Sequence, residues 1–133
     1  MLKATFDERE GRLTLELEGH AGQAEEGQDI VCSSCSILAY TVAQIVKDYA
    51  EDGKLKSEPK ISLKKGYSII SCEPKKKAYA ELQYAYTVAR VGYLLLENNY
   101  PQFVELEMFG TEKSVNINQK IRSLTSRLFK RRP

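Results

Sequence analysis

The stretch GHAGQAEEGQDIVCSSCSILA, residues 19–39, contains the point at which strand-like periodicity gives way to helix-like periodicity. Apolar residues alternate with polar ones before it. From Asp29 onward they recur every three or four residues, at Val31, Cys35, Leu38, Val42, Ile45 and Tyr49. This spacing predicts an amphipathic helix, and Asp29 directly before it is a favoured N-cap residue. Residues 22–28 are small, polar and without periodicity, so we expect a loop there.

Alternating patterns on both sides of this segment predict strands. Before it, residues 2–6 and 13–17 alternate on either side of the polar sequence DEREG, which is typical of a hairpin. After it, residues 60–72, KISLKKGYSIISC, predict a second hairpin that turns at KKG, and residues 103–109, FVELEMF, predict a fifth strand. The apolar residues that share a face of the first hairpin are Leu2, Ala4, Phe6, Leu13, Leu15 and Leu17.

A second helix is predicted over residues 76–98. Its apolar positions have heptad-like spacing, at Tyr79, Leu82, Tyr86, Ala89, Tyr93 and Leu96. Asn98, Asn99 and Pro101 are expected to end it. The order of elements is therefore ββαββαβ. We expect an α+β domain with a mostly antiparallel five-stranded sheet and two helices packed on one face.

The charge of the chain is divided unevenly between two parts. The 133 residues carry a net charge of +2, but residues 110–133 hold seven Lys and Arg against one acid, Glu112, which gives +6. Residues 1–109 hold the remaining 13 basic and 17 acidic groups, or −4. We therefore expect a domain over residues 1–110 and a basic tail over residues 111–133. The tail pattern predicts a short amphipathic basic helix, with Ile117, Ile121, Leu124 and Leu128 on one face.

The composition also predicts a cellular compartment. The chain has no apolar run of about 18 residues that would span a membrane, and its first residues are charged rather than signal-like. Three cysteines without framework spacing are typical of a reducing environment. We therefore expect a cytoplasmic protein without membrane attachment.

Two residues are the candidates for chemistry. Cys35 lies on the apolar stripe and Cys72 ends a strand, so both are explained as small core residues. Cys32 lies off the stripe in the expected first turn, where free amides and the helix dipole stabilise a thiolate. The only histidine, His20, follows Gly19 at a strand end and leads into the loop before Cys32. This pattern indicates a thiol nucleophile with its general base, and helix-start amides could form an oxyanion site.

Two other chemistries share these residues. CSSC is a CxxC motif, but thioredoxin-like redox proteins place it in a βαβ unit, which the expected order lacks. A Cys₃His zinc site would need His20, Cys32, Cys35 and Cys72, of which only Cys32 and Cys35 are close in sequence. We therefore expect neither a metal nor a cofactor.

The same segment resembles the signature of a known family, the ribosomal-processing cysteine proteases called Prp. That signature reads Gly-His-Ala, a short loop, Gly-x-Asp-Ile-Val-Cys, small residues and then Ser. The matching positions are Gly19, His20, Ala21, Gly27, Asp29, Ile30, Val31, Cys32 and Ser36. The resemblance implies that Cys32 is the nucleophile and His20 the general base. It places Asp29 and Ser36 near this dyad, Gly19 and Gly27 in the surrounding motif, and the loop of residues 22–28 over the substrate.

The resemblance also implies an activity. Proteins of this family are cytosolic, homodimeric endopeptidases that remove an N-terminal extension from the large-subunit ribosomal protein numbered twenty-seven, after paired aromatic residues. Related phage proteins trim capsid or scaffold proteins. The chain departs from the family in having Ser33, Ser34 and Cys35 after the nucleophile, so that Cys35 could trap Cys32 in a regulatory disulfide.

The basic tail is the second departure from the family and leaves two interpretations open. It is either a helix docked on the domain or a segment that attaches electrostatically to ribosomal RNA, where a +6 charge gains affinity by releasing counterions. The alternative function is a non-catalytic ribosome- or RNA-associated module in which the thiols are structural.

Overall fold

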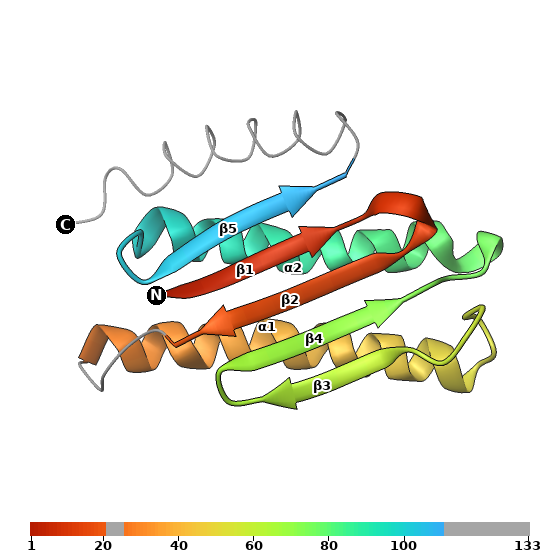
Figure 1. The fold of residues 1–133 in the computed structure, drawn as a ribbon, viewed down its shortest axis with the longest axis horizontal. Helices are drawn as coiled ribbons and strands as arrows, with labels where there is room; N and C mark the ends of the chain where they lie inside the picture. Colours follow the sequence, from red (N-terminus) through yellow and green to blue (C-terminus); the bar gives the residue numbers. More distant parts are fainter. Residues whose placement is uncertain (21–25, 111–133) are drawn as a thin grey trace.

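A computed structural model describes residues 1–20 and 26–110, and the backbone alone for residues 26–29. Its elements are β1 (Leu2–Asp7), η1 (Arg9–Gly11), β2 (Leu13–Gly19), α1 (Glu26–Glu51), β3 (Lys60–Lys64), β4 (Tyr67–Cys72), η2 (Lys76–Ala78), α2 (Tyr79–Asn99) and β5 (Val104–Phe109). The α+β architecture with five strands and two helices is confirmed (Figure 1). The basic tail and its expected helix lie outside the described residues.

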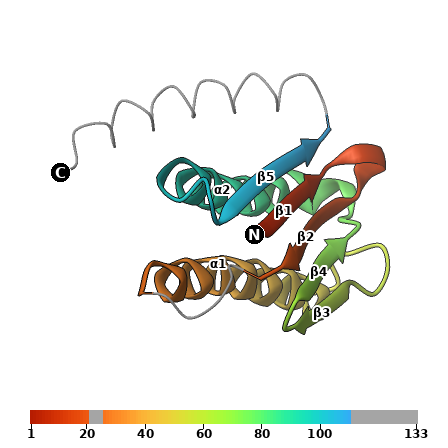
Figure 2. The ribbon, with the colours of Figure 1, turned by 60° about the vertical axis from the view of Figure 1, so that its left-hand side comes forward.

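The strands form one sheet in the order β3-β4-β2-β1-β5. Three neighbouring pairs are antiparallel, while β1 and β5 run parallel, so the sheet is mixed (Figure 2). The chain passes from β4 to β5 through α2. A crossover element of this kind lets the chain return in the same direction, so β5 runs parallel to both β4 and β1. Leu2 lies opposite Gly19 on one side and Val104 on the other. The start of β1 is therefore next to the end of β2.

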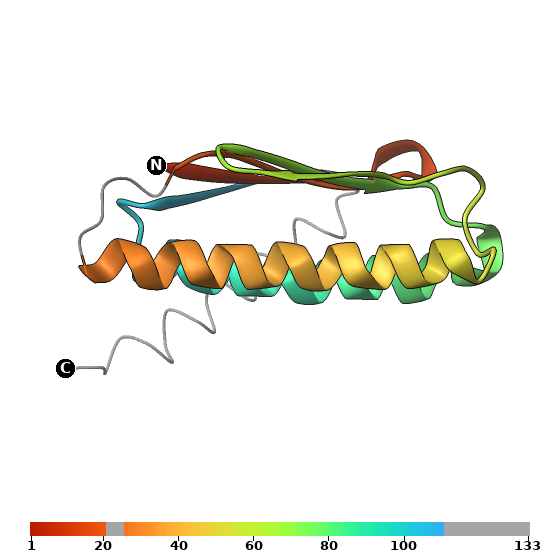
Figure 3. The ribbon, with the colours of Figure 1, turned by 90° about the horizontal axis from the view of Figure 1, so that it is seen from below.

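Both helices cover the same face of the sheet (Figure 3). The alternating residues of β1 and β2 face them and are buried, as their period-two pattern predicts. The helices also pack closely on each other: a Cβ added to Gly92 of α2 would lie 2.6 Å from Cδ1 of Leu38 in α1. The largest fully buried side chains include Phe6, Leu13, Leu15, Ile70, Leu82, Tyr86 and Tyr93.

The start of the first helix differs from the prediction. Asp29 is not its N-cap, because α1 begins at Glu26 and Asp29 belongs to its first turn. Cys32 consequently lies in the second turn. Residues 26–28 carry Glu, Gly and Gln, so this turn has no apolar residue to produce a periodic signal. The second helix differs less: residues 76–78 form η2, and α2 runs from Tyr79 to Asn99.

Among the described residues, one helix, over Ile30–Glu51, is long and apolar enough to cross a membrane, so the expectation that no segment meets this test is wrong. Its buried residues face the sheet and α2, and they include Val31, Cys35, Ala39, Val42 and Val46. The apolar content of this segment is therefore explained by its position as a core helix of the domain.

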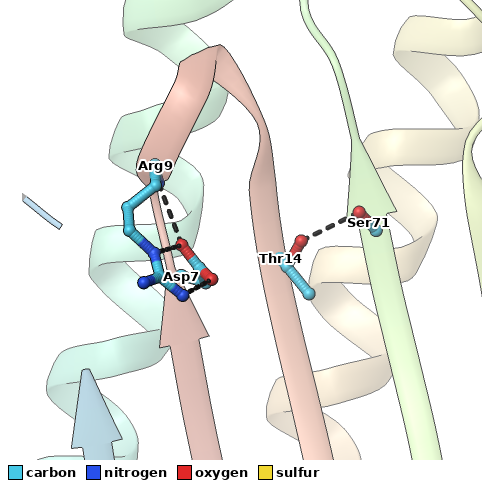
Figure 4. A network of polar contacts seen from close by, with 4 residues as sticks. All are labelled: Asp7, Arg9, Thr14 and Ser71. Carbon is cyan, nitrogen blue, oxygen red and sulfur yellow. Dashed lines mark hydrogen bonds and ion pairs between the residues drawn. The ribbon is translucent and has the colours of Figure 1, made fainter. Parts of the chain in front are cut away.

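A polar network holds the end of the sheet opposite His20 (Figure 4). The Arg9 guanidinium donates to both carboxylate oxygens of Asp7, at 3.0 and 2.7 Å, and the Arg9 amide donates to the same carboxylate. These contacts tie η1 to the end of β1. The side-chain hydrogen bond from Arg9 also holds the pKa of Asp7 below its usual value. Thr14 and Ser71 share a hydrogen bond of 2.8 Å between β2 and β4.

Candidate active site

A cleft of about 320 Å³ opens at the end of β2, between α1 and the turn that joins β3 to β4. From α1 it is lined by Cys32, Ser36 and Tyr40, which are spaced four residues apart and so share one face of the helix, and also by the buried Cys35 and Ala39. His20 lines the same cleft from the end of β2. The structure therefore brings together the candidate nucleophile, the candidate base and Ser36, which come from two separate elements.

The backbone at the end of β2 determines where His20 enters the cleft. Gly19 has φ of +91°, and a Cβ there would lie 2.4 Å from the carbonyl oxygen of Met1. Its N–H donates to the carbonyl of Gly66 at 3.0 Å. Only glycine fits this close approach of the first strand, so Gly19 fixes the direction in which the chain leaves the sheet.

The β3–β4 turn lies directly against the imidazole. A Cβ added to Gly66, which has φ of +88°, would lie 3.1 Å from Cε1 and 3.2 Å from Nε2 of His20. Gly66, which belongs to a hairpin remote in sequence, therefore packs directly against the His20 ring. The sequence analysis found the turn at KKG but assigned this glycine no role, because the pattern of a hairpin does not show which side chain packs against its turn.

The three cysteines are all free thiols, and only one of them is exposed. Cys35 is 1% exposed, and burial, followed by the nearby Cys32, raises the pKa of its thiol to about 12. Burial likewise raises the pKa of Cys72, whose Sγ lies 3.7 Å from Oη of Tyr86. The interpretation of Cys35 and Cys72 as core residues is thus confirmed. Cys32 and Cys35 both line the cleft, and Cys32 is the one of the three thiols that is exposed.

A buried tyrosine anchors the helix that carries the thiol. Oη of Tyr93 in α2 donates to the carbonyl of Cys35 at 2.7 Å, one turn after Cys32. The Tyr93 ring also packs against Phe6 of β1, with ring centroids 5.8 Å apart. These two contacts link α1, α2 and the sheet at one point beside the cleft.

The zinc and redox alternatives lack the required geometry. Cys72 lies opposite Leu13 at the start of β2, whereas His20 follows the other end of that strand, about 20 Å away. Within residues 1–20 and 30–110, no three His, Cys, Asp or Glu side chains gather in a group that could hold a metal ion. The CSSC motif follows an antiparallel hairpin rather than a βαβ unit.

The prediction that Cys32 lies in the first turn, beside the free amides and the positive end of the helix dipole, is wrong. Only the first four N–H groups of a helix lack a helical partner, and α1 begins at Glu26, so the amide of Cys32 lies inside the hydrogen-bonded helix. The helix dipole acts mainly within the first turn, which Cys32 does not occupy. Thiolate stabilisation and an oxyanion site at this point therefore cannot rest on free helix amides. Asp29 and Gly27 lie in the first turn, and their roles stay predictions.

The described lining of the cleft combines an apolar floor with a basic rim. Leu2, Leu17 and Leu63 contribute the apolar part, and Lys64 and Lys65 the basic part. None of the described lining residues is acidic. The cleft can thus receive an apolar side chain next to the exposed thiol.

Comparisons with known proteins agree with this arrangement. The sequence profile of a family described as cysteine protease Prp matches residues 1–105. The crystal structure of SMU.848 from Streptococcus mutans is similar, with 26% identity, a TM-score of 0.63 and coverage of 84% of this chain and 96% of that one. No curated protein matches the sequence at a significant level.

The structure of the essential ribosomal processing protease Prp from S. aureus has the same fold. With a covalently linked product peptide it gives 21% identity, a TM-score of 0.60 and coverage of 81% of this chain and 99% of that one. With a substrate peptide it gives 19% identity, a TM-score of 0.59 and the same coverage.

Proposed function

The chain belongs to the Prp family of cysteine proteases, and from this membership we propose that it is an endopeptidase with Cys32 as nucleophile and His20 as general base. The observation that carries the proposal is the cleft itself. It contains the one exposed thiol and the one histidine of the chain, supplied by α1 and by the end of β2.

The chemistry follows from these two side chains. His20 takes the thiol proton, and the thiolate of Cys32 attacks the scissile carbonyl. His20 then gives the proton to the leaving amine, and the C–N bond breaks as a thioester forms. A water molecule, deprotonated by His20, attacks the thioester and releases the acid product and the free thiol. No cofactor or metal is needed for any of these steps.

The proposed substrate is the precursor of a large-subunit ribosomal protein, the one numbered twenty-seven, cut after paired aromatic residues. Family membership supports a processing role, and the S. aureus protein of the same fold is described as a ribosomal processing protease. The apolar floor formed by Leu2, Leu17 and Leu63 beside Cys32 supports an aromatic side chain at the cleavage point.

The proposed assembly is a cytoplasmic homodimer. The outer surfaces of the two helices expose apolar side chains that nothing in the described residues covers, among them Ile30 and Ile37 of α1 and Tyr84 and Val88 of α2. A second copy would remove these residues from water. Sedimentation of the full chain and of a Tyr84→Glu variant tests this, and an unchanged monomer in both contradicts it.

The proposed role of residues 111–133 is attachment to ribosomal RNA. Their +6 charge supports this, since a basic segment gains affinity for RNA by displacing counterions. Deletion of residues 112–133 should leave peptide cleavage intact and weaken salt-sensitive binding to ribosomes. Unfolding of the shortened chain would instead identify the tail as part of the core.

The decisive experiment for the activity uses a peptide with a central Phe-Phe pair. Native protein should cleave it after the second phenylalanine, as shown by mass spectrometry of the products, and the Cys32→Ala variant should not. The non-catalytic alternative predicts an intact peptide with both proteins.

A further inference from the structure

The two edge strands of the sheet differ in whether their outward-pointing backbone groups have hydrogen-bond partners within the described part of the domain. At the β5 edge, Leu2 N–H donates to the carbonyl of Phe103, and Glu8 N–H to that of Phe109. Odd-numbered β5 residues therefore face β1, and even-numbered ones face outward. Two outward amides have partners within the domain: Val104 N–H donates to the carbonyl of Tyr100 at 3.0 Å, and Leu106 N–H to the carboxylate of Glu97 at 2.7 Å.

The outward-pointing backbone groups of β3 have no such partners among the described residues. The two-residue turn makes Lys64 and Tyr67 a hydrogen-bonded pair, so Lys64, Ser62 and Lys60 direct their backbone groups to β4. The backbone groups of Ile61 and Leu63 then point outward. In the part of the chain that the structure describes, no hydrogen bond from another segment reaches them. Figure 1 shows β3 as the outermost strand on this side.

The open edge leads into the active-site cleft. Leu63, Lys64 and Lys65, at the end of β3 and in the turn, line that cleft. Across from them, Ser36 and Tyr40 continue along α1 from Cys32. Leu63 is 38% exposed and Tyr40 is 54% exposed, so both present apolar surface to the cleft that they line. An apolar groove thus runs from the thiol between α1 and the outer edge of β3.

We propose that the substrate peptide adds to the sheet as a further strand along β3, antiparallel or parallel to it, with one side chain inserted between Leu63 and Tyr40. This rests on the proposed protease function and specifies how that site holds its substrate. Main-chain hydrogen bonds to Ile61 and Leu63 supply affinity for an extended chain, and the groove supplies the preference for an apolar side chain. Because β3 runs away from Cys32 in one direction, only one side of the scissile bond lies on it.

The first test uses the unaltered protein and a peptide series. A backbone N-methyl group is placed at each position of the Phe-Phe peptide in turn, and KM and kcat are measured. Methylation should raise KM about five- to tenfold at every second residue on one side of the scissile bond, because each such amide loses one hydrogen bond. The intervening positions should change little. A uniform effect along the peptide, or none, would overturn strand addition.

The second test alters the edge. Leu63→Pro removes the outward amide donor, whereas Leu63→Ala keeps that donor, and both remove the branched isobutyl group. Leu63→Pro should raise KM about five- to tenfold above Leu63→Ala, with the fold of both checked by circular dichroism. Equal KM values in two folded variants would contradict the proposal. Cleavage of the unmethylated peptide by native protein reports the protease function separately, and its absence would reject both proposals together.

Discussion

Cys32 and Cys35 are the same residue type, one helical turn apart on α1, yet the fold gives them opposite properties. Both line the cleft, but Cys32 is exposed there beside His20, whereas Cys35 belongs to the core and is 1% exposed. Burial disfavours the thiolate of Cys35, as its raised pKa shows. The comparison shows that the CxxC spacing alone does not identify the accessible thiol. The direction in which each side chain leaves the helix decides which thiol can meet a substrate.

Removal of the exposed thiol should have the largest effect. Cys32→Ala should reduce cleavage of the Phe-Phe peptide by several orders of magnitude, because the other two thiols are buried and Cys32 alone is exposed. Cys72→Ala is the matched control, since it removes a free thiol at the far end of the sheet and should keep most of the activity. Equal loss in both variants, with folding intact, would break the distinction between the cysteines.

Removal of the His20 imidazole should have the next largest effect on cleavage. His20→Ala should lower peptide cleavage about a hundred- to ten-thousandfold, because hydrolysis needs a proton donor for the leaving amine. Iodoacetamide labelling of Cys32 should fall much less, since small alkylating reagents need no such donor. Parallel measurement of both rates, with mapping of the labelled residue, checks this. If neither rate changes, His20 has no part in the chemistry.

The position of the imidazole should matter less than its presence. Gly66→Ala should lower kcat about ten- to a hundredfold, because the new methyl group would press on Cε1 and Nε2 of His20. Gly53→Ala is a close control: Gly53 also has positive φ, of +70°, but no atom lies within 4 Å of its added Cβ. Both variants bear a similar backbone strain of about 1–2 kcal/mol. Equal activity in the two would show that Gly66 acts only on stability.

These residues also show what a sequence can predict. Local periodicity was sufficient for the strands and the second hairpin, since each pattern there reports a face buried in one sheet. Cys32 and His20 were found from residue type and context. The first turn of α1 was missed because residues 26–28 include no apolar residue that would give a periodic signal. The packing of Gly66 against His20 was missed because it depends on a contact across 46 residues.

The smallest effect on activity is expected at Cys35. Cys35→Ala should change cleavage by less than about twofold, and it should lower the free energy of unfolding by about 1 kcal/mol through lost packing. It should also alter the dependence of stability on pH. In the unfolded chain this thiol loses its proton near its ordinary pKa of 9.0, whereas in the folded protein it keeps the proton to about pH 12. The unfolded state therefore binds fewer protons between these values, and stability falls as pH rises through them. Denaturant unfolding at pH 8 and 10 should show a smaller loss for Cys35→Ala than for native protein. An equal loss in both would mean that Cys35 is not buried as a neutral thiol, and the contrast with Cys32 would disappear.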